Sequence, residues 1–176
     1  MLKRSLAVLC TVLGLTGCAG ASPELYRAQT PVLDLTQYFN GPLTAWGYFA
    51  DRSGKVKRRF TVSVTGVWRG NEGTLTEDFV WSDGERSQRI WKLTKLDAHR
   101  YIGRADDVKG EAVGVAYGNA LQWKYTLLLP VDGKTYEVQF DDWMYLMDDS
   151  VMLNKSEMRK FGVKLGEIVL SFRRGS

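Results

Sequence analysis

Residues Leu121–Leu129, with the sequence LQWKYTLLL, show the most regular alternation of apolar and polar side chains in the chain. Polar residues stand at positions 122, 124 and 126, and the apolar positions between and beside them are Leu121, Trp123, Tyr125, Leu127 and Leu129. Side chains of a β-strand point alternately to its two faces. The pattern therefore predicts an antiparallel strand with one face in a core and the other in solvent.

The same two-residue period recurs along most of the chain, interrupted by Gly, Asn and Asp. It predicts strands near residues 43–50, 56–69, 73–82, 87–96, 99–105, 110–117, 120–130, 134–147, 150–154 and 164–173. Short helical turns are expected within residues 32–40 and near residues 155–161. We predict an all-β fold, an antiparallel up-and-down β-barrel rather than a sandwich, because the connections are short throughout. Such a barrel holds packed side chains or one small ligand.

The chain begins with the features of a secretory signal. Lys3 and Arg4 precede an apolar stretch, residues 6–15, that is too short to span a bilayer. The stretch ends in LTGC, residues 15–18, which resembles the bacterial lipobox, where the cysteine is acylated and becomes the first residue of the mature protein. The alternative is an ordinary signal peptide with an accidental cysteine.

The lipobox predicts a division of the chain into three parts. Residues 1–17 form the signal peptide, residues 18–31 the lipidated N-terminus and tether, and residues 32–176 a single barrel domain. Thioether lipid and an acylated amino terminus together suffice for stable membrane anchoring. Ala19, instead of an aspartate, follows the cysteine, and the resemblance then implies the periplasmic face of the outer membrane.

Cysteines and charge exclude several functions. Cys10 lies in the predicted signal peptide and Cys18 is used by the lipid, so that no thiol remains for a disulfide, a nucleophile or a zinc site. Loss of Lys3 and Arg4 lowers the formal net charge from +4 to +2. We therefore expect the membrane as a partner, through the lipid anchor, and no nucleic acid. A protein partner is not identified by the sequence.

Odd and even positions of a strand point to opposite faces of the sheet, a property that we call strand parity. Strand parity predicts which side chains face the barrel interior. The inward set combines aromatic and apolar residues with three charged ones: Arg58, Phe60, Glu77, Phe79, Trp81, Trp123, Tyr125, Phe140, Asp142 and Met144. These residues are the predicted ligand site. The three charged residues form either a structural network or a site for a ligand head group. In the second case Arg58 would pair with the acidic head group of a fatty-acid-like ligand.

The QFDDWMYLMDD stretch, residues 139–149, leaves one alternative open. Unbroken alternation buries Asp142, which is costly without a partner, whereas a β-bulge at Asp141–Asp142 would turn its side chain outward. Asp148 and Asp149 suit a hairpin turn, where their side chains bond the local backbone.

The residues give no reason to expect an enzyme. The single histidine, His99, lies in the predicted turn DAHRY, and no nucleophile has a base within a recognisable motif. No set of metal ligands and no phosphate-binding loop is visible, so that no metal and no cofactor are expected.

Several longer segments carry a resemblance to a known family: YFNGPLTAWGYFADRSGKVKRRF, EDFVWSDGE, YGNALQWKY, DDWMYLMDD and LNKSEMRKFGVKLGEI. They resemble a family of uncharacterised proteobacterial lipoproteins, a domain of unknown function with a lipocalin-like (calycin) β-barrel. The resemblance implies a lipid-related role. Calycin barrels further imply that Trp46 packs at the closed end against Arg173 or Arg174. The chain departs from lipocalins in having Gly41 and Trp46 where they have Gly-x-Trp.

Two functions then follow as hypotheses, with an enzyme as a third. A periplasmic lipoprotein could bind a small apolar, fatty-acid-like molecule in the barrel. Alternatively, a barrel filled by its own side chains would serve a structural or interaction role. The volume of the interior distinguishes them.

Overall fold

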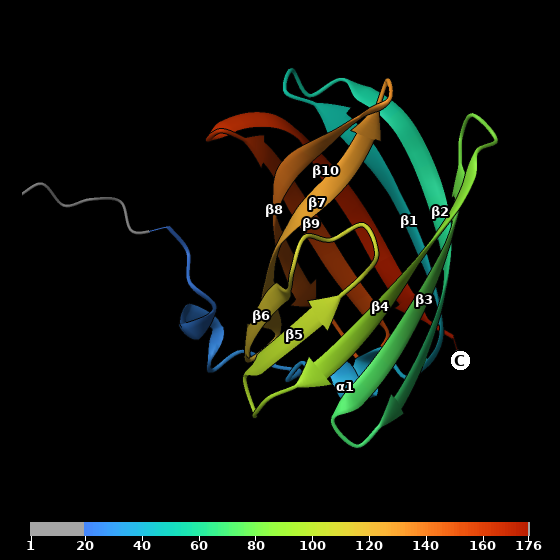
Figure 1. The fold of residues 1–176 in the computed structure, drawn as a ribbon. Coiled ribbons are helices and arrows are strands. Elements are labelled where there is room, and N and C mark those ends of the chain that lie inside the picture. The colour runs from blue at the N-terminus through green and yellow to red at the C-terminus, as the bar shows by residue number, and fades with distance from the viewer. Residues whose placement is uncertain (1–19, 176) are drawn as a thin grey trace, which may run out of the picture.

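The computed structural model describes residues 20–175, which form a closed barrel of antiparallel strands (Figure 1). Within this range the strands are β1 Gly41–Asp51, β2 Val56–Arg69, β3 Glu72–Trp81, β4 Arg86–Lys95, β5 Arg100–Arg104, β6 Ala112–Tyr117, β7 Ala120–Val131, β8 Lys134–Leu146, β9 Val151–Lys160 and β10 Val163–Arg174. Each strand pairs with its sequence neighbours, and β1 pairs with β10 to close the sheet. This topology confirms the predicted all-β, antiparallel up-and-down barrel.

The predicted signal peptide and Cys18 lie outside the described residues. Among residues 20–175, no helix has the length and apolar character needed to cross a membrane. All strand pairs of the closed barrel and its buried core lie within the same range. A protein that starts at residue 20 therefore contains every strand of the closed barrel.

Strand β9 corrects the prediction of a helical turn near residues 155–161. The strand continues to Lys160 and pairs with β10 along its length, with Ser156 opposite Ile168. Its inward positions alternate Met152, Asn154, Ser156 and Met158, all of them buried. Because two of these four inward residues are polar, the sequence of β9 lacks the regular alternation of apolar and polar residues that identifies a strand.

The interior position of Asp142 is settled by the registers of β8. Asp142 lies opposite Trp123 of β7 and Ser156 of β9, and neither pairing has a register shift. The side chain is 6% exposed. The alternative of a bulge at Asp141–Asp142 is therefore wrong, whereas Asp148 does stabilise a turn by accepting hydrogen bonds from the backbone N–H groups of Ser150 and Val151.

One end of the barrel is closed by the short helix α1, Leu35–Tyr38, which confirms the helical turn expected there (Figure 1). Asp34 caps the helix by accepting from the Thr36 N–H at 2.9 Å and forms an ion pair with Lys95 at 2.8 Å. We call the buried apolar residues of this segment the floor: Leu33, Leu35, Tyr38 and Phe39. The floor joins the apolar core inside the barrel.

The predicted tether is packed against the barrel from Pro23 onward. A 3₁₀ turn, η1 Pro23–Tyr26, lies outside the sheet, and the Tyr26 ring packs against Tyr145 and Trp143 at centroid distances of 5.3 and 6.1 Å. A Cβ atom on Gly118 would lie 1.8 Å from the Tyr26 carbonyl oxygen, so only glycine permits this approach. The barrel-associated part thus begins well before residue 32.

The predicted contact between Trp46 and Arg173 or Arg174 is absent. Ala45 is fully buried whereas Trp46 is 48% exposed, so the strand parity turns the indole outward. Among the described residues, no cation–π contact involves Trp46. The closed end is filled instead by Phe39, whose ring lies 5.5 Å from that of Phe172.

Candidate ligand cavity

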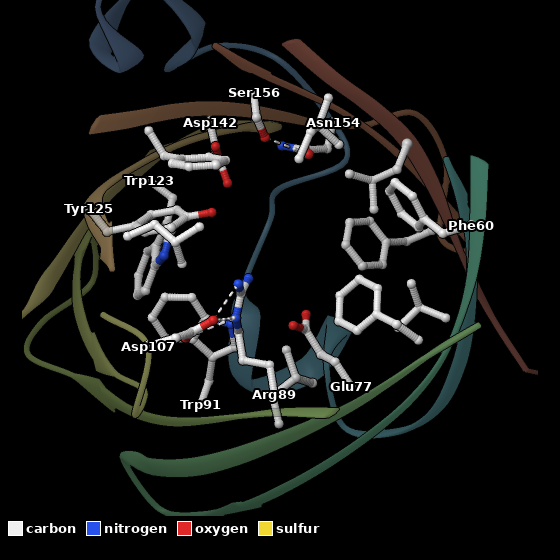
Figure 2. A pocket seen from close by; sticks show the side chains of 18 of the residues that line it. Phe60, Glu77, Arg89, Trp91, Asp107, Trp123, Tyr125, Asp142, Asn154 and Ser156 are labelled. Carbon is white, nitrogen blue, oxygen red and sulfur yellow. Dashed lines mark hydrogen bonds and ion pairs between the residues drawn. The ribbon is translucent and has the colours of Figure 1, made fainter. Parts of the chain in front are cut away.

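The barrel encloses a cavity of about 470 Å³ (Figure 2). Leu35 and Phe39 of the floor line its closed end. At the opposite end, which we call the mouth, the cavity is lined by Ser87 and Gln88, and both are exposed to solvent. The ligand site predicted from strand parity lies along this cavity, since all ten of its residues line it. That they bind a ligand stays a prediction.

Aromatic side chains form two separate walls of the cavity. On β2 and β3, the ring of Phe60 lies 5.8 Å from Phe79 and 5.0 Å from Trp81. On the other side, Trp91 of β4 meets Trp123 and Tyr125 of β7 at 5.7 and 5.5 Å, and Tyr125 stacks on Phe140 of β8 at 4.9 Å. Within residues 20–175, no aromatic pair joins one wall to the other.

Two glycines keep Trp123 against the sheet. Added Cβ atoms on Gly103 of β5 and Gly114 of β6 would lie 2.6 and 2.4 Å from the Trp123 ring. Because neither strand has a side chain there, the large indole packs flat on β5 and β6. The centre of the barrel therefore stays open although a tryptophan points inward.

A charged group stands between the aromatic walls. Arg89 of β4 lies directly opposite Glu77 of β3 in the sheet register. Its guanidinium donates to both carboxylate oxygens of Asp107, in the β5–β6 loop, from Nε at 3.1 and 2.9 Å and from Nη2 at 2.6 Å. This bidentate arrangement is the strong form of the arginine–carboxylate pair. Arg89 is thus already paired inside the barrel.

Glu77 and Asp142 are the interior carboxyls without such a partner. Burial raises the pKa of Glu77 to about 7, and the positive charge of Arg89 offsets only part of this effect. Part of the Glu77 side chain is accessible, but its carboxyl projects into the cavity and not into bulk solvent (Figure 2). Burial also raises the pKa of Asp142 to about 7. Near neutral pH each carboxyl is therefore partly protonated.

Arg58 does not join Glu77 and Asp142 in a charge cluster, which corrects that prediction. It lies near the mouth, where its Nη2 atom is 2.8 Å from Asp83 and 2.8 Å from Glu85. Its guanidinium also lies over the Trp81 ring at 4.1 Å. Strand parity correctly predicted an inward side chain, but carboxylates of the β3–β4 turn hold it.

Sequence reasoning missed four polar residues inside the cavity, Arg89, Asp107, Asn154 and Ser156, and two at its mouth, Ser87 and Gln88. Arg89 could have been predicted to face the interior, because it shares strand parity with the buried residues Trp91 and Leu93. Asp107 lies in a loop, where no period exists. His99 stacks on Tyr117 at 3.9 Å and does not line the cavity. Within residues 20–175, no group of three or more His, Cys, Asp or Glu side chains is placed to hold a metal ion.

The strand pairing and the lined interior define a closed antiparallel β-barrel with an internal cavity of a size suited to a small molecule. Within this class the chain belongs to the family described as protein of unknown function DUF3833, whose model matches residues 12–174. No curated protein matches the chain. A similar solved structure is a de novo designed fluorescence-activating beta barrel, with 14% identity and a TM-score of 0.44, covering 81% of this chain and 99% of that one. The strand pairing, and not this similarity, establishes the barrel.

Proposed function

We propose that this protein is a lipid-anchored periplasmic lipoprotein whose barrel holds one small, largely apolar molecule with an acyl or alkyl chain. The cavity is the observation that supports this function. Its volume of about 470 Å³ lies within the range of small-molecule sites. Aromatic and aliphatic side chains line most of it, and a few polar groups are available to orient a bound molecule.

The alternative of a side-chain-filled barrel would require the inward aromatics to meet in the centre. They pair only within their own walls, and Trp123 packs flat against β5 and β6. The interior thus keeps the space that a bound molecule needs.

A dye-displacement assay tests the binding function. A protein that starts at residue 20 is titrated with an apolar fluorescent dye, which is then displaced by single-chain amphiphiles of positive, negative and zero charge. Ser156→Phe places a ring in the cavity, whereas Lys155→Phe places one on the outer face of the same strand. We expect saturable binding that Ser156→Phe weakens at least about tenfold and Lys155→Phe leaves unchanged. Absence of binding by the unmodified protein across all three probe classes would refute the function.

The anchor is tested separately with the full chain. We propose that Cys18 carries the lipid and holds the protein at the periplasmic face of the outer membrane, on the basis of the LTGC motif. Cys18→Ser is expected to accumulate as uncut precursor or to leave the membrane fraction. Normal processing and outer-membrane fractionation of the variant would contradict acylation at this residue. Cys10→Ser, in the same segment, is the control and should behave as the unmodified protein.

A further inference from the structure

The cavity has an excess of negative groups. The ionisable residues that face it are Glu77 from β3, Arg89 from β4, Asp107 from the β5–β6 loop, Tyr125 from β7 and Asp142 from β8, with Arg58 from β2 at the mouth. The charge of Arg89 is matched by Asp107, and Arg58 has two carboxylates of its own. This leaves Glu77 and Asp142 as carboxyls for which the lining residues supply no remaining cation.

Asp142 is also incompletely hydrogen-bonded. Its side chain is 6% exposed, and among the described residues its Oδ1 atom has no hydrogen-bond partner. The nearby hydroxyl of Ser156 donates to Asn154 at 3.3 Å. A buried carboxylate oxygen without a donor has lost its hydration without compensation, and a bound donor would supply the missing hydrogen bond.

The two carboxyls lie on opposite sides of the cavity. Figure 2 shows Asp142 and Glu77 projecting from β8 and β3 into the same space, with Tyr125 beside Asp142 and Arg89 beside Glu77. Burial and the charge of Asp142 raise the pKa of Tyr125 well above its ordinary value, so that its hydroxyl stays neutral. The polar end of a bound molecule would therefore meet acceptors and a hydroxyl before it met a free cation.

We infer that the molecule held in the barrel carries a protonated amine, which binds Asp142 with Glu77 facing it across the cavity, while its alkyl part lies along the aromatic walls. This inference rests on the proposed binding function and specifies its ligand class. An ammonium group supplies three N–H donors and one positive charge, which would offset one of the two carboxylate charges and attract the other. A fatty-acid carboxylate would instead add a third uncompensated negative charge, since Arg89 is already occupied.

Three probes with the same chain separate head-group recognition from binding of the chain. Decylammonium and decanoate, below their micelle concentrations, and decanol, below its solubility limit, are titrated into the protein that starts at residue 20 by isothermal titration calorimetry at pH 8. We expect decylammonium to bind at least about tenfold more tightly than either other probe, as a charged hydrogen bond in a partly buried site provides.

Matched variants assign that preference to the interior carboxyls. Asp142→Asn and Glu77→Gln remove each charge with little change of shape. Asp141→Asn is the control, because the adjacent Asp141 points to the outer face and accepts from Gln122 at 2.7 Å. The ammonium preference should fall at least about tenfold in Asp142→Asn and persist in Asp141→Asn. If Asp142→Asn does not fold, Glu77→Gln provides the same comparison with a carboxyl on another strand.

The outcomes distinguish the inference from the function on which it rests. Equal binding of the three probes, tighter binding of decanoate, or an ammonium preference that survives both interior substitutions would overturn the amine ligand and leave the binding barrel standing. Failure of all three probes to bind would count against the binding function itself. Loss of preference in Asp142→Asn, with Asp141→Asn unchanged, supports the amine.

Discussion

The two ends of the barrel are built from the same strands but are filled differently. Toward the floor, Val62 and Val64 of β2 are 2% exposed and pack with Phe39 in one apolar core. Toward the mouth, the same face of β2 carries Phe60 and Arg58, which line the cavity. The strand pattern does not differ between the halves. The difference arises from the segment before β1, which supplies apolar side chains to one end alone.

This division separates the end that stabilises the fold from the end that we propose binds a ligand. A filled, apolar end provides most of the packing energy, because buried apolar area is the main stabilising contribution in a domain. The other end can then contain poorly compensated carboxyls, which reduce stability. A fold tolerates such destabilising groups where the rest of the molecule is stable enough to offset them.

The largest effect is expected from removing a floor side chain. Phe39 is 4% exposed and contacts Tyr38 and Phe172 edge to face at 5.1 and 5.5 Å. We expect Phe39→Ala to lower the free energy of unfolding by ~3–5 kcal/mol. Phe79→Ala, on the cavity wall, should cost only ~1–2 kcal/mol, because part of the ring already faces open space.

Urea denaturation of both variants, in the protein that starts at residue 20, measures this difference. Equal losses would mean that the cavity wall is packed as densely as the floor. The division of the barrel into a stabilising and a binding end would then be incorrect.

A smaller effect is expected from the interior carboxyls, with a defined dependence on pH. Because Asp142 and Glu77 have folded-state pKa values of about 7, above those of the unfolded chain, the folded protein binds more protons between about pH 4 and pH 7. Stability should therefore fall as the pH rises through this window and level off above it. Carboxyls with a lowered pKa, such as Asp97 at about 2, lose their contribution only in more acidic solution.

Asp142→Asn isolates one of the two groups. At pH 8 the variant should be more stable than the unmodified protein by ~1–3 kcal/mol, since a poorly compensated buried charge is gone. The difference should nearly disappear near pH 4, where Asp142 is protonated in the folded state and about half protonated in the unfolded state. Urea midpoints at the two pH values measure it. An unchanged difference between pH 4 and pH 8 would show that Asp142 does not titrate inside the barrel.

The sequence predicted the aromatic walls of the cavity better than the polar residues between them. Strand parity placed Phe60, Trp123 and Phe140 inside, because apolar inward residues alternate with polar outward ones. It failed in β9, where Asn154 and Ser156 are inward and polar, so that a strand resembled a helical turn. A binding cavity needs polar residues at some inward positions, and these positions weaken the pattern from which strands are predicted.

The charge partners could not be predicted for a different reason. Asp83 and Glu85 reach Arg58 from a hairpin turn, and Asp107 reaches Arg89 from a loop. Neither connection has an alternating pattern of apolar and polar residues that would indicate where its side chains point. Parity alone therefore placed Arg58, Glu77 and Asp142 in one charge cluster, although Arg58 is paired with Asp83 and Glu85 at the mouth.

The smallest effect is expected at the mouth itself. Arg58 is held by two exposed carboxylates and by the Trp81 ring, and exposed ion pairs contribute little to stability or binding. We expect Arg58→Gln to leave the urea midpoint nearly unchanged and to alter the affinity for decanol or decylammonium by less than about fivefold. Calorimetry with the same probes measures this. A more than tenfold loss of decanoate affinity, without a change for decanol, would instead place the head group of the ligand at the mouth, because an acidic group would then be bound by Arg58 and not by the interior.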